Sequence, residues 1–134
     1  MTNKVVPRVL VVDDDPSILN LYRGVFRWKN LALDTADDGL DAIKKILAGQ
    51  YNLILLDLMM PHMSGFQVIQ WLKANRPESL RCVVVVTALS PDAYRELDRT
   101  LIHDLVAKPF DVAELEGYIV DFLAGKGVSW IPEP

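Results

Sequence analysis

Five polar side chains each close an apolar segment of the sequence: Asp13, Asp14, Asp57, Thr87 and Lys108. The clearest is Asp57, which follows the apolar run Leu53–Leu56. A continuous apolar run bounded by turn residues suits a strand covered on both faces, as in a parallel sheet. The carboxyl ends of such strands share one edge, where open α/β sheets bind ligands. A carboxylate nucleophile, a hydroxyl, a lysine and a bound metal are the groups needed to form and hold an acyl phosphate.

Each of these signals alone has an ordinary structural explanation. Asp57 could cap the next turn, an Asp-Asp pair after a strand is commonly a turn or a helix cap, and Lys108-Pro109 could simply end a strand. Their joint placement favours a site. Three carboxylates close together repel one another and need a cation to stay ionised at neutral pH. Carboxylates, carbonyls and water are the ligands that Mg²⁺ prefers, so the sequence predicts a magnesium site at this edge.

Five strands and five helices in alternation are expected to position these residues. The strands are expected at residues 8–12, 31–33, 53–56, 82–86 and 105–107, from their apolar and β-branched runs. Each helix follows a capping signal, and the fourth is expected to run from Ser90 to about Thr100. In the second helix, the residues expected to face inward are Leu40, Ile43, Ile46 and Leu47. Alternation of strand and helix predicts an α/β fold, with a parallel sheet covered on both faces.

Length and composition limit the possible functions. The 134 residues are expected to form one domain over 1–124, with 125–134 as a C-terminal tail or the start of a linker. Trp130 and Ile131 are apolar for a free tail, so they either pack back on the domain or mark a contact. A net charge of −4 gives no support for nucleic-acid or membrane binding. No apolar stretch is long enough to span a bilayer and no signal peptide is evident, so a cytoplasmic location is expected.

The motifs resemble those of the response-regulator receiver domain of two-component signal transduction, over about residues 8–123. The segments that carry the resemblance are Val11–Asp15, Leu55–Pro61, Ser64-Gly65, Thr87-Ala88 and Lys108–Phe110. The resemblance implies a flavodoxin-like, doubly wound, five-stranded parallel sheet of order 2-1-3-4-5 with five helices, as in chemotaxis receivers.

The same resemblance implies which residues hold Mg²⁺. Asp14 matches the direct ligand, and Asp13 matches the carboxylate that acts through water. Asp57 and the backbone carbonyl of Met59 complete the protein ligands in this family.

The resemblance also assigns the chemistry of phosphotransfer. Asp57 matches the phosphoacceptor, Thr87 the hydroxyl that moves to meet the phosphoryl group, and Lys108 the lysine that pairs with a phosphoryl oxygen. The Lys108-Pro109 bond would be cis, which a tertiary amide permits. The donor would be a phosphohistidine on a sensor histidine kinase or a phosphotransfer protein. Such a domain is a phosphoacceptor that catalyses its own phosphotransfer and dephosphorylation, rather than an enzyme acting on a separate substrate.

The resemblance places the output on the face made by the fourth helix, the fifth strand and the fifth helix. A downstream protein, a missing output domain or a second copy in a phosphorylation-dependent homodimer would bind there, with no direct contact to nucleic acid. Two departures affect this face. Leu105 stands where an aromatic switch residue is usual, and Leu101–Asp104 lacks the usual Gly-Ala turn. We therefore expect an altered readout with phosphorylation itself intact.

Three other functions use some of the same residue types. A phosphohydrolase with an aspartate nucleophile normally has a second aspartate two residues on, where this chain has Met59. A dinucleotide-binding domain would have a glycine-rich turn after the first strand, where this chain has Asp13–Asp15. A receiver-like interaction module that no longer takes phosphate is the main alternative, although Asp57 and the residues expected around it are all present.

Overall fold

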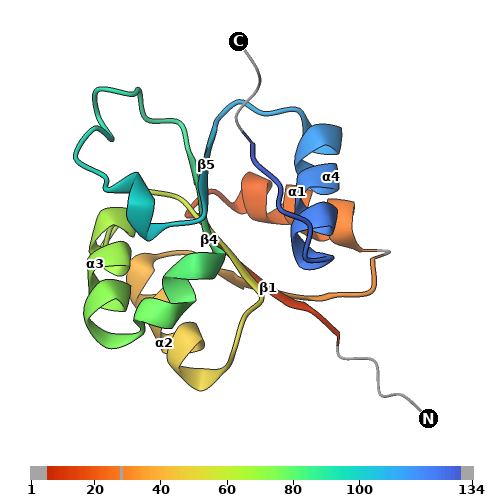
Figure 1. Ribbon diagram of the computed structural model, residues 1–134, viewed down its shortest axis with the longest axis horizontal. Helices are drawn as coiled ribbons and strands as arrows, with labels where there is room; N and C mark the ends of the chain where they lie inside the picture. The colour runs from red at the N-terminus through yellow and green to blue at the C-terminus, as the bar shows by residue number, and fades with distance from the viewer. Residues whose placement is uncertain (1–5, 28, 131–134) are drawn as a thin grey trace.

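The computed structural model describes residues 6–27 and 29–130, and its centre is a parallel sheet (Figure 1). The strands, in chain order, are β1 (Arg8–Val12), β2 (Ala32–Ala36), β3 (Leu53–Leu56), β4 (Val83–Thr87) and β5 (Asp104–Ala107). All pair in parallel, in the order β2-β1-β3-β4-β5. The predicted doubly wound, flavodoxin-like fold is confirmed, because this order reverses direction between β1 and β3.

Helices cover both faces of the sheet, α1 and α4 on one and α2 and α3 on the other (Figure 1). Their bounds are α1 (Pro16–Phe26), α2 (Gly39–Ala48), α3 (Gly65–Asn75) and α4 (Val112–Leu123). A short 3₁₀ helix, η1 (Pro77–Cys82), leads into β4, and another, η2 (Arg99–Leu101), precedes β5. The N-caps are Asp15, Asp38, Ser64 and Asp111, each of which accepts a hydrogen bond from a backbone amide of the first turn.

Side chains of the central strands alternate between two halves of the core. Leu10 and Ile54 lie on the side of α2 and α3, whereas Val9 and Leu55 lie on the side of α1 and α4. Burial on both faces explains why β3 and β4 are apolar at every position before their ends. Among the described residues, no helix combines the length and the apolar character that crossing a membrane requires.

The segment expected to form a fourth α-helix does not do so. Residues 91–97 form a series of turns, and regular structure returns only at η2. The amides of Ala93 and Tyr94 bond to the Ser90 carbonyl, but no i→i−4 ladder continues from this turn. The Asp98 side chain then accepts a bond from the Thr100 amide and begins η2. The cap and proline at Ser90-Pro91 start a turn, which the sequence after them does not extend.

The inward face predicted for α2 is also wrong in part. Leu40 is 58% exposed and Leu47 is 51% exposed, whereas Ala42 and Ile46 are buried with Gly39. This orientation of the helix brings Gly39 into close contact with the loop after β3. A β-carbon at Gly39 would lie 2.3 Å from the Met63 carbonyl oxygen, and the Gly39 amide donates to that oxygen.

Candidate functional site

Strand pairing places the predicted site residues at one edge of the sheet. Val12 pairs with Leu56, so the residues that follow them, Asp13 and Asp57, leave the sheet side by side. The Asp57 amide donates to the Val12 carbonyl at 3.0 Å and extends the ladder beyond the strands. On the other side, the Lys108 amide donates to the Thr87 carbonyl at 2.8 Å. The backbone of the sheet therefore fixes where these side chains start.

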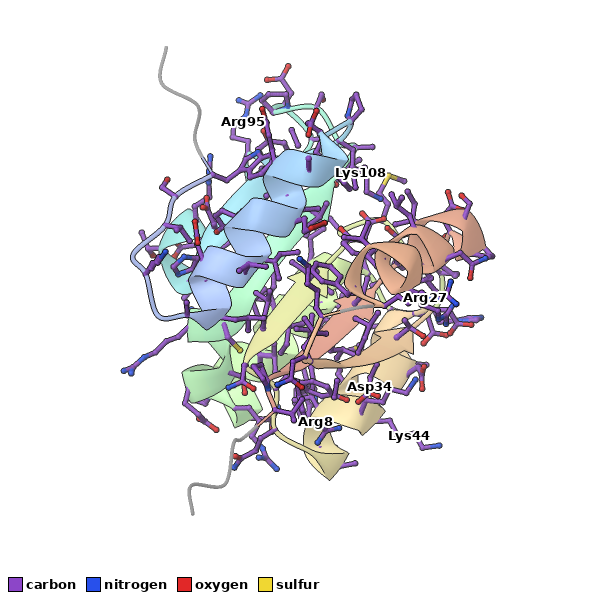
Figure 2. All side chains as sticks on the ribbon, turned by 90° about the vertical axis from the view of Figure 1, so that its right-hand side faces the viewer. Arg8, Arg27, Asp34, Lys44, Arg95 and Lys108 are labelled. Carbon is purple, nitrogen blue, oxygen red and sulfur yellow. The ribbon has the colours of Figure 1, made fainter. Side chains whose placement is uncertain are left out.

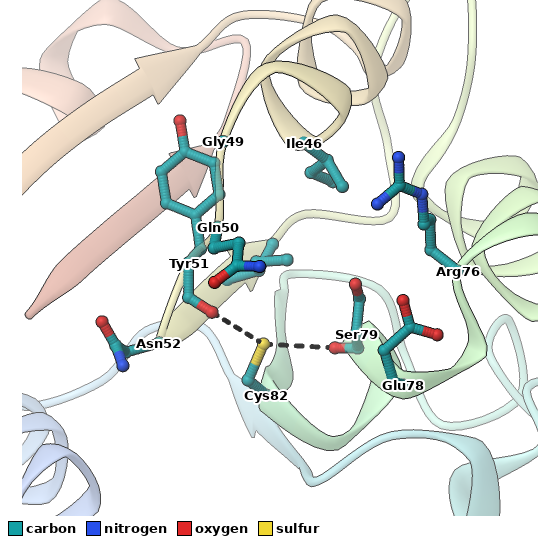
Figure 3. A pocket seen from close by; sticks show the side chains of 10 residues that line it. Ile46, Gly49, Gln50, Tyr51, Asn52, Arg76, Glu78, Ser79 and Cys82 are labelled. Carbon is teal, nitrogen blue, oxygen red and sulfur yellow. Dashed lines mark hydrogen bonds between the residues drawn. The ribbon is translucent and has the colours of Figure 1, made fainter.

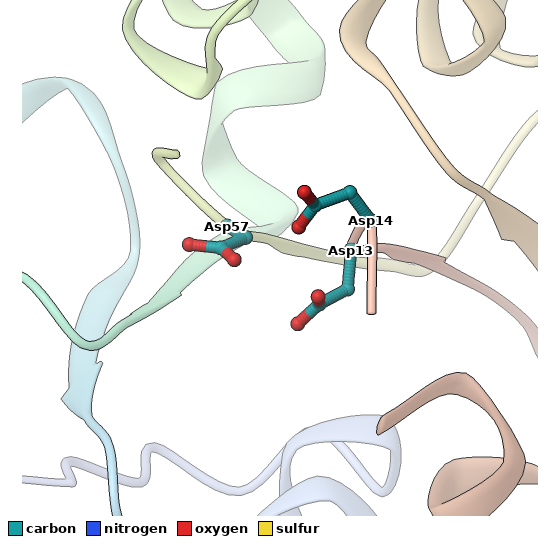
Figure 4. Close-up of side chains that lie close together, drawn as sticks. All are labelled: Asp13, Asp14 and Asp57. Carbon is teal, nitrogen blue, oxygen red and sulfur yellow. The ribbon is translucent and has the colours of Figure 1, made fainter. Parts of the chain in front are cut away.

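Three carboxylates converge at this edge (Figure 4). Asp13, Asp14 and Asp57 each offer one oxygen, and these oxygens lie within 4.8 Å of one another. Asp13 is 3% exposed and Asp57 is 8% exposed, whereas Asp14 is exposed at the mouth of the site. One solvent-facing and two buried carboxylates suit a hard divalent cation that keeps part of its water shell, so this donor set fits Mg²⁺.

Lys108 joins the two buried carboxylates. Its Nζ donates to Asp13 Oδ2 at 2.7 Å and to Asp57 Oδ2 at 3.4 Å. The side chain is only 16% exposed, so solvent screens these contacts weakly. Lys108 lies at the end of the molecule opposite Arg8, the first residue of β1 (Figure 2). The bond between Lys108 and Pro109 is cis, as predicted.

Burial and neighbouring charges shift the pKa values of Asp57 and Lys108. Burial raises the pKa of Asp57, and the adjacent Asp13 raises it further, which outweighs the lowering by Lys108. Burial lowers the pKa of Lys108, but the hydrogen bond to Asp13 and the two carboxylate charges raise it above its ordinary value. The lysine is therefore a fixed positive charge, whereas ionised Asp57 still lacks full compensation. A further cation would stabilise it.

The carboxylates and Lys108 line an open cleft of about 540 Å³. Asp15, Met59, Met60 and Pro61 form the rest of its wall. The Met59 amide donates to Asp57 Oδ1 at 3.3 Å, and the Met59 side chain is 61% exposed at the rim. An apolar group at the rim removes one means of activating a water molecule there, because a thioether has no useful basicity.

Thr87 is brought to the edge, but its hydroxyl is not part of the cleft wall. The residue is fully buried, and its Oγ1 accepts a hydrogen bond from the Leu89 amide at 3.2 Å. The hydroxyl thus holds the start of the turn-rich loop that follows β4. Leu105, at the expected switch position, is 6% exposed and packs on the same side of the sheet as Leu97 and Ile102.

Gly65 allows the start of α3 to approach the backbone after β3 closely, which the sequence motif alone did not reveal. A β-carbon at Gly65 would lie 2.2 Å from the Asp57 carbonyl oxygen and 2.7 Å from the Leu58 α-carbon. The start of α3 therefore rests directly on the backbone that carries Asp57. Ser64 and Gln67 form a capping box that fixes this helix end.

Asp104 is a buried carboxylate that the sequence analysis did not single out. It is 8% exposed, and its Oδ2 accepts hydrogen bonds from the Tyr118 hydroxyl and the Trp130 amide. A charged residue where an apolar strand begins was the available signal. Without the fold, its partners in α4 and in the tail could not be identified.

A second cavity, of about 450 Å³, lies at the opposite edge of the sheet (Figure 3). Its wall includes Cys82, whose thiol donates to the carbonyls of Tyr51 at 3.6 Å and Ser79 at 3.2 Å. Burial raises the pKa of this thiol to about 11. Cys82 is therefore protonated at neutral pH and does not offer a thiolate nucleophile to this cavity.

Comparison with known proteins identifies the class. Residues 9–120 match the family model described as the response regulator receiver domain, and the chain belongs to this family. It is 34% identical over 110 residues to the transcriptional regulatory protein DltR of Streptococcus agalactiae, covering 81% of this chain and 48% of that protein. It is 35% identical over 109 residues to ResD of Bacillus subtilis, covering 81% and 44%. The chain thus spans about half the length of the curated relatives it matches.

Solved structures agree with this assignment. The response regulator TrrA of Thermotoga maritima, in complex with Mg²⁺ and beryllofluoride, has 31% identity and a TM-score of 0.74, covering 87% of this chain and 99% of that one. The receiver domain of a LuxO repressor protein from Vibrio parahaemolyticus has 30% identity and a TM-score of 0.79, covering 90% and 92%.

Proposed function

We propose that this domain is the phosphoacceptor of a two-component or phosphorelay pathway, and that Asp57 accepts a phosphoryl group in a Mg²⁺-dependent reaction. The proposal is carried by one observation: the Lys108 ammonium contacts two buried carboxylates, one of which is Asp57. The donor is a phosphohistidine of a sensor histidine kinase or a phosphotransfer protein. The domain works in the cytoplasm, where such donors carry their phosphohistidine.

Each residue of the site has a distinct part in the transfer. An oxygen of Asp57 forms a bond to phosphorus while the bond from phosphorus to the donor imidazole nitrogen breaks, and the imidazole takes a proton from solvent. Lys108, 3.4 Å from Asp57 Oδ2, places its charge where the phosphoryl oxygens arrive. Asp13 and Asp14, with Asp57 and the Met59 carbonyl, would hold Mg²⁺. When bound, the ion would offset charge on the transferring group.

Phosphorylation then changes the competition for Lys108. In the unphosphorylated structure, the Lys108 ammonium is closer to Asp13, at 2.7 Å, than to Asp57, at 3.4 Å. A phosphoryl group adds charge and strong acceptor oxygens on the Asp57 side, which draws Lys108 away from Asp13. The same oxygens can accept a hydrogen bond from the Thr87 hydroxyl, whose oxygen at present accepts one from the Leu89 amide. Movement of Thr87 would release the loop after β4, which is the start of the output face made by that loop, β5 and α4.

Receiver domains usually couple movement of the hydroxyl residue, here Thr87, to movement of an aromatic residue. Leu105 stands at that aromatic position, so the coupling is expected to differ in this domain. Leu105 is already buried, so an inward swing is not required to close the core. We infer that the output depends on the loop after β4 more than on residue 105. Phosphorylation-dependent dimerisation or partner binding that survives Leu105→Ala supports this inference, whereas its loss assigns Leu105 the switch role.

The deciding experiment treats the full chain with Mg²⁺ and acetyl phosphate, or beryllofluoride, and measures intact mass and elution from a size-exclusion column. The wild type should gain the mass of one phosphoryl group, and Asp57→Asn should gain none. Asp92→Asn, at an exposed surface carboxylate, is the matched control and should behave as the wild type. No mass gain in the wild type would instead favour an interaction module that works without phosphate. The elution volume reports whether modification drives a homodimer.

A further inference from the structure

The segment after α4 turns back along the helix toward the site end of the molecule (Figures 1 and 2). Gly125, with φ of +79°, ends the helix in the left-handed region that glycine adopts without strain. Its amide donates to the Phe122 carbonyl, and the Lys126 amide donates to the Asp121 carbonyl. These bonds reverse the chain and set residues 126–130 against the domain. Residues 126–130 thus form a strap.

Asp104, the first residue of β5, holds the end of the strap. Its Oδ2 accepts hydrogen bonds from the Trp130 amide at 2.7 Å and from the Tyr118 hydroxyl at 2.9 Å. Its Oδ1 accepts one from the Leu105 amide at 2.9 Å. A buried carboxylate is tolerated only when its oxygens are bonded, so removal of the strap would leave Asp104 with an unfilled position that water or a partner must occupy.

Aromatic contacts complete the attachment. The rings of Trp130 and Tyr118 meet edge to face, with centroids 5.6 Å apart and planes at 90°. Earlier in the strap, His103 Nε2 lies 3.3 Å from the Val128 carbonyl oxygen, and the His103 ring packs edge to face on Phe122 at 4.7 Å. Val128 and Trp130 also join the apolar cluster under α4. The strap is therefore specifically bound.

The strap covers the surface between β5 and α4, which belongs to the output face. The same strand links it to the phosphoacceptor site. β5 begins at Asp104 and ends at Ala107, and Lys108 follows directly. Four residues of strand span about 13 Å, so a displacement of Lys108 toward Asp57 acts on a short, stiff element whose other end holds the strap.

We propose that the strap is an intramolecular latch, which covers the surface between β5 and α4 in the unphosphorylated domain and opens when Asp57 is phosphorylated. This inference rests on the proposed function. The latch is held by a few hydrogen bonds and one ring contact on a partly exposed segment, so it belongs to the low-stability part of the fold. Coupling between two such events is reciprocal, so opening the latch must favour the phosphorylated state by the same factor.

Hydrogen exchange of the Trp130 amide measures the latch directly, because that amide donates to Asp104 when the latch is closed. The full chain is compared by NMR with Mg²⁺ alone and with Mg²⁺ and beryllofluoride. Exchange at Trp130 should become about fivefold faster or more with beryllofluoride. The Leu10 amide in the centre of β1 is the control and should not accelerate. Trp130→Ala should lower the Kd for beryllofluoride by up to the same factor, whereas Val120→Ala, an exposed apolar residue of α4, should leave it unchanged.

The outcomes distinguish failure of the latch from failure of the phosphoacceptor role. If acetyl phosphate modifies Asp57 but Trp130 exchanges no faster with beryllofluoride, the latch is refuted and the phosphoacceptor role stands. Acceleration of Trp130 and Leu10 together would indicate general loosening, and this also refutes the latch. If Asp57 is not modified, the proposed function fails and the latch fails with it.

Discussion

Lys108→Gln tests the electrostatics of the site. The substitution keeps most of the side-chain volume but removes the charge that contacts Asp13 and Asp57. Without it, the two buried carboxylates face each other and Asp14 with no cation of the protein between them. We expect the variant to be markedly less stable than the wild type at neutral pH when divalent ions are absent.

The size of the loss follows from the two distances. At an effective dielectric constant of about 20, unit charges attract by roughly 6 kcal/mol at 2.7 Å and roughly 5 kcal/mol at 3.4 Å. Desolvation of the ammonium offsets much of this attraction, and removal of one partner from a buried ion pair commonly costs about 3–5 kcal/mol. Because Lys108 is partly open to solvent, we expect about 3 kcal/mol. For a domain of this size, that corresponds to a fall in Tm of about 10 °C.

Urea unfolding at neutral pH in the presence of a chelator measures this free energy. Lys29→Gln is the matched control, because Lys29 Nζ lies 3.3 Å from Glu116 Oε1 at a more exposed position. Its loss should be below about 1 kcal/mol. Adding Asp13→Asn to Lys108→Gln should restore part of the lost stability by removing one repelling charge. A Lys108→Gln protein as stable as the Lys29→Gln protein would show that the buried contacts do not carry the energy assigned to them.

The metal site, Asp57 and Gly65 can each be probed separately. Mg²⁺ at about 100 times its Kd should raise the free energy of unfolding of the wild type by about 2.7 kcal/mol, and Asp14→Asn should remove most of this gain in melts with and without chelator. Burial, together with the charge of Asp13, raises the pKa of Asp57 in the folded state. Protonated Asp57 therefore favours folding at low pH, and this contribution to the free energy of unfolding is lost as the pH rises through the folded-state pKa. Without divalent ions, Asp57→Asn should therefore have a higher Tm than the wild type at neutral pH, and a difference that does not shrink toward about pH 4 would contradict this. Gly65→Ala should destabilise the domain by about 1–3 kcal/mol, whereas Gly117→Ala, in open space within α4, should stabilise it by up to about 1 kcal/mol; equal effects in urea unfolding would count against the close approach at Gly65.

The sheet and the acidic site were predictable because their signals are local and strong. β3 and β4 are buried on both faces, so their apolar runs stand out, and each polar residue that ends a strand is easily recognised. Parallel pairing then determines that such residues meet at one edge. The predicted cis bond at Lys108-Pro109 is confirmed. The ligand role of the Met59 carbonyl and the domain boundary at residue 124 stay predictions.

The features that were missed depend on contacts between distant segments. The sequence places Leu40 and Leu47 on an apolar stripe, but the helix brings Gly39 into close contact with Met63 and leaves both leucines exposed. The caps at Ser90-Pro91 are real turn signals, yet the residues after them do not form a continuous helix. The sequence left open whether the tail packs on the domain. The structure shows that Trp130 does, whereas Ile131 lies outside the described residues.

The two loops that follow β3 and β4, near the acidic cleft, are held to the rest of the fold differently. On one side, the loop from Asp57 to Met63 is clamped at both ends, because Gly39 and Gly65 allow helix ends to rest directly on its backbone. On the other side, the described backbone hydrogen bonds of residues 89–97 stay within that segment or reach Thr87. A group bound to Asp57 would therefore displace the loop of residues 57–63 less easily than residues 89–97. If Asp57 is phosphorylated as proposed, the rearrangement is expected in the segment that leads to β5.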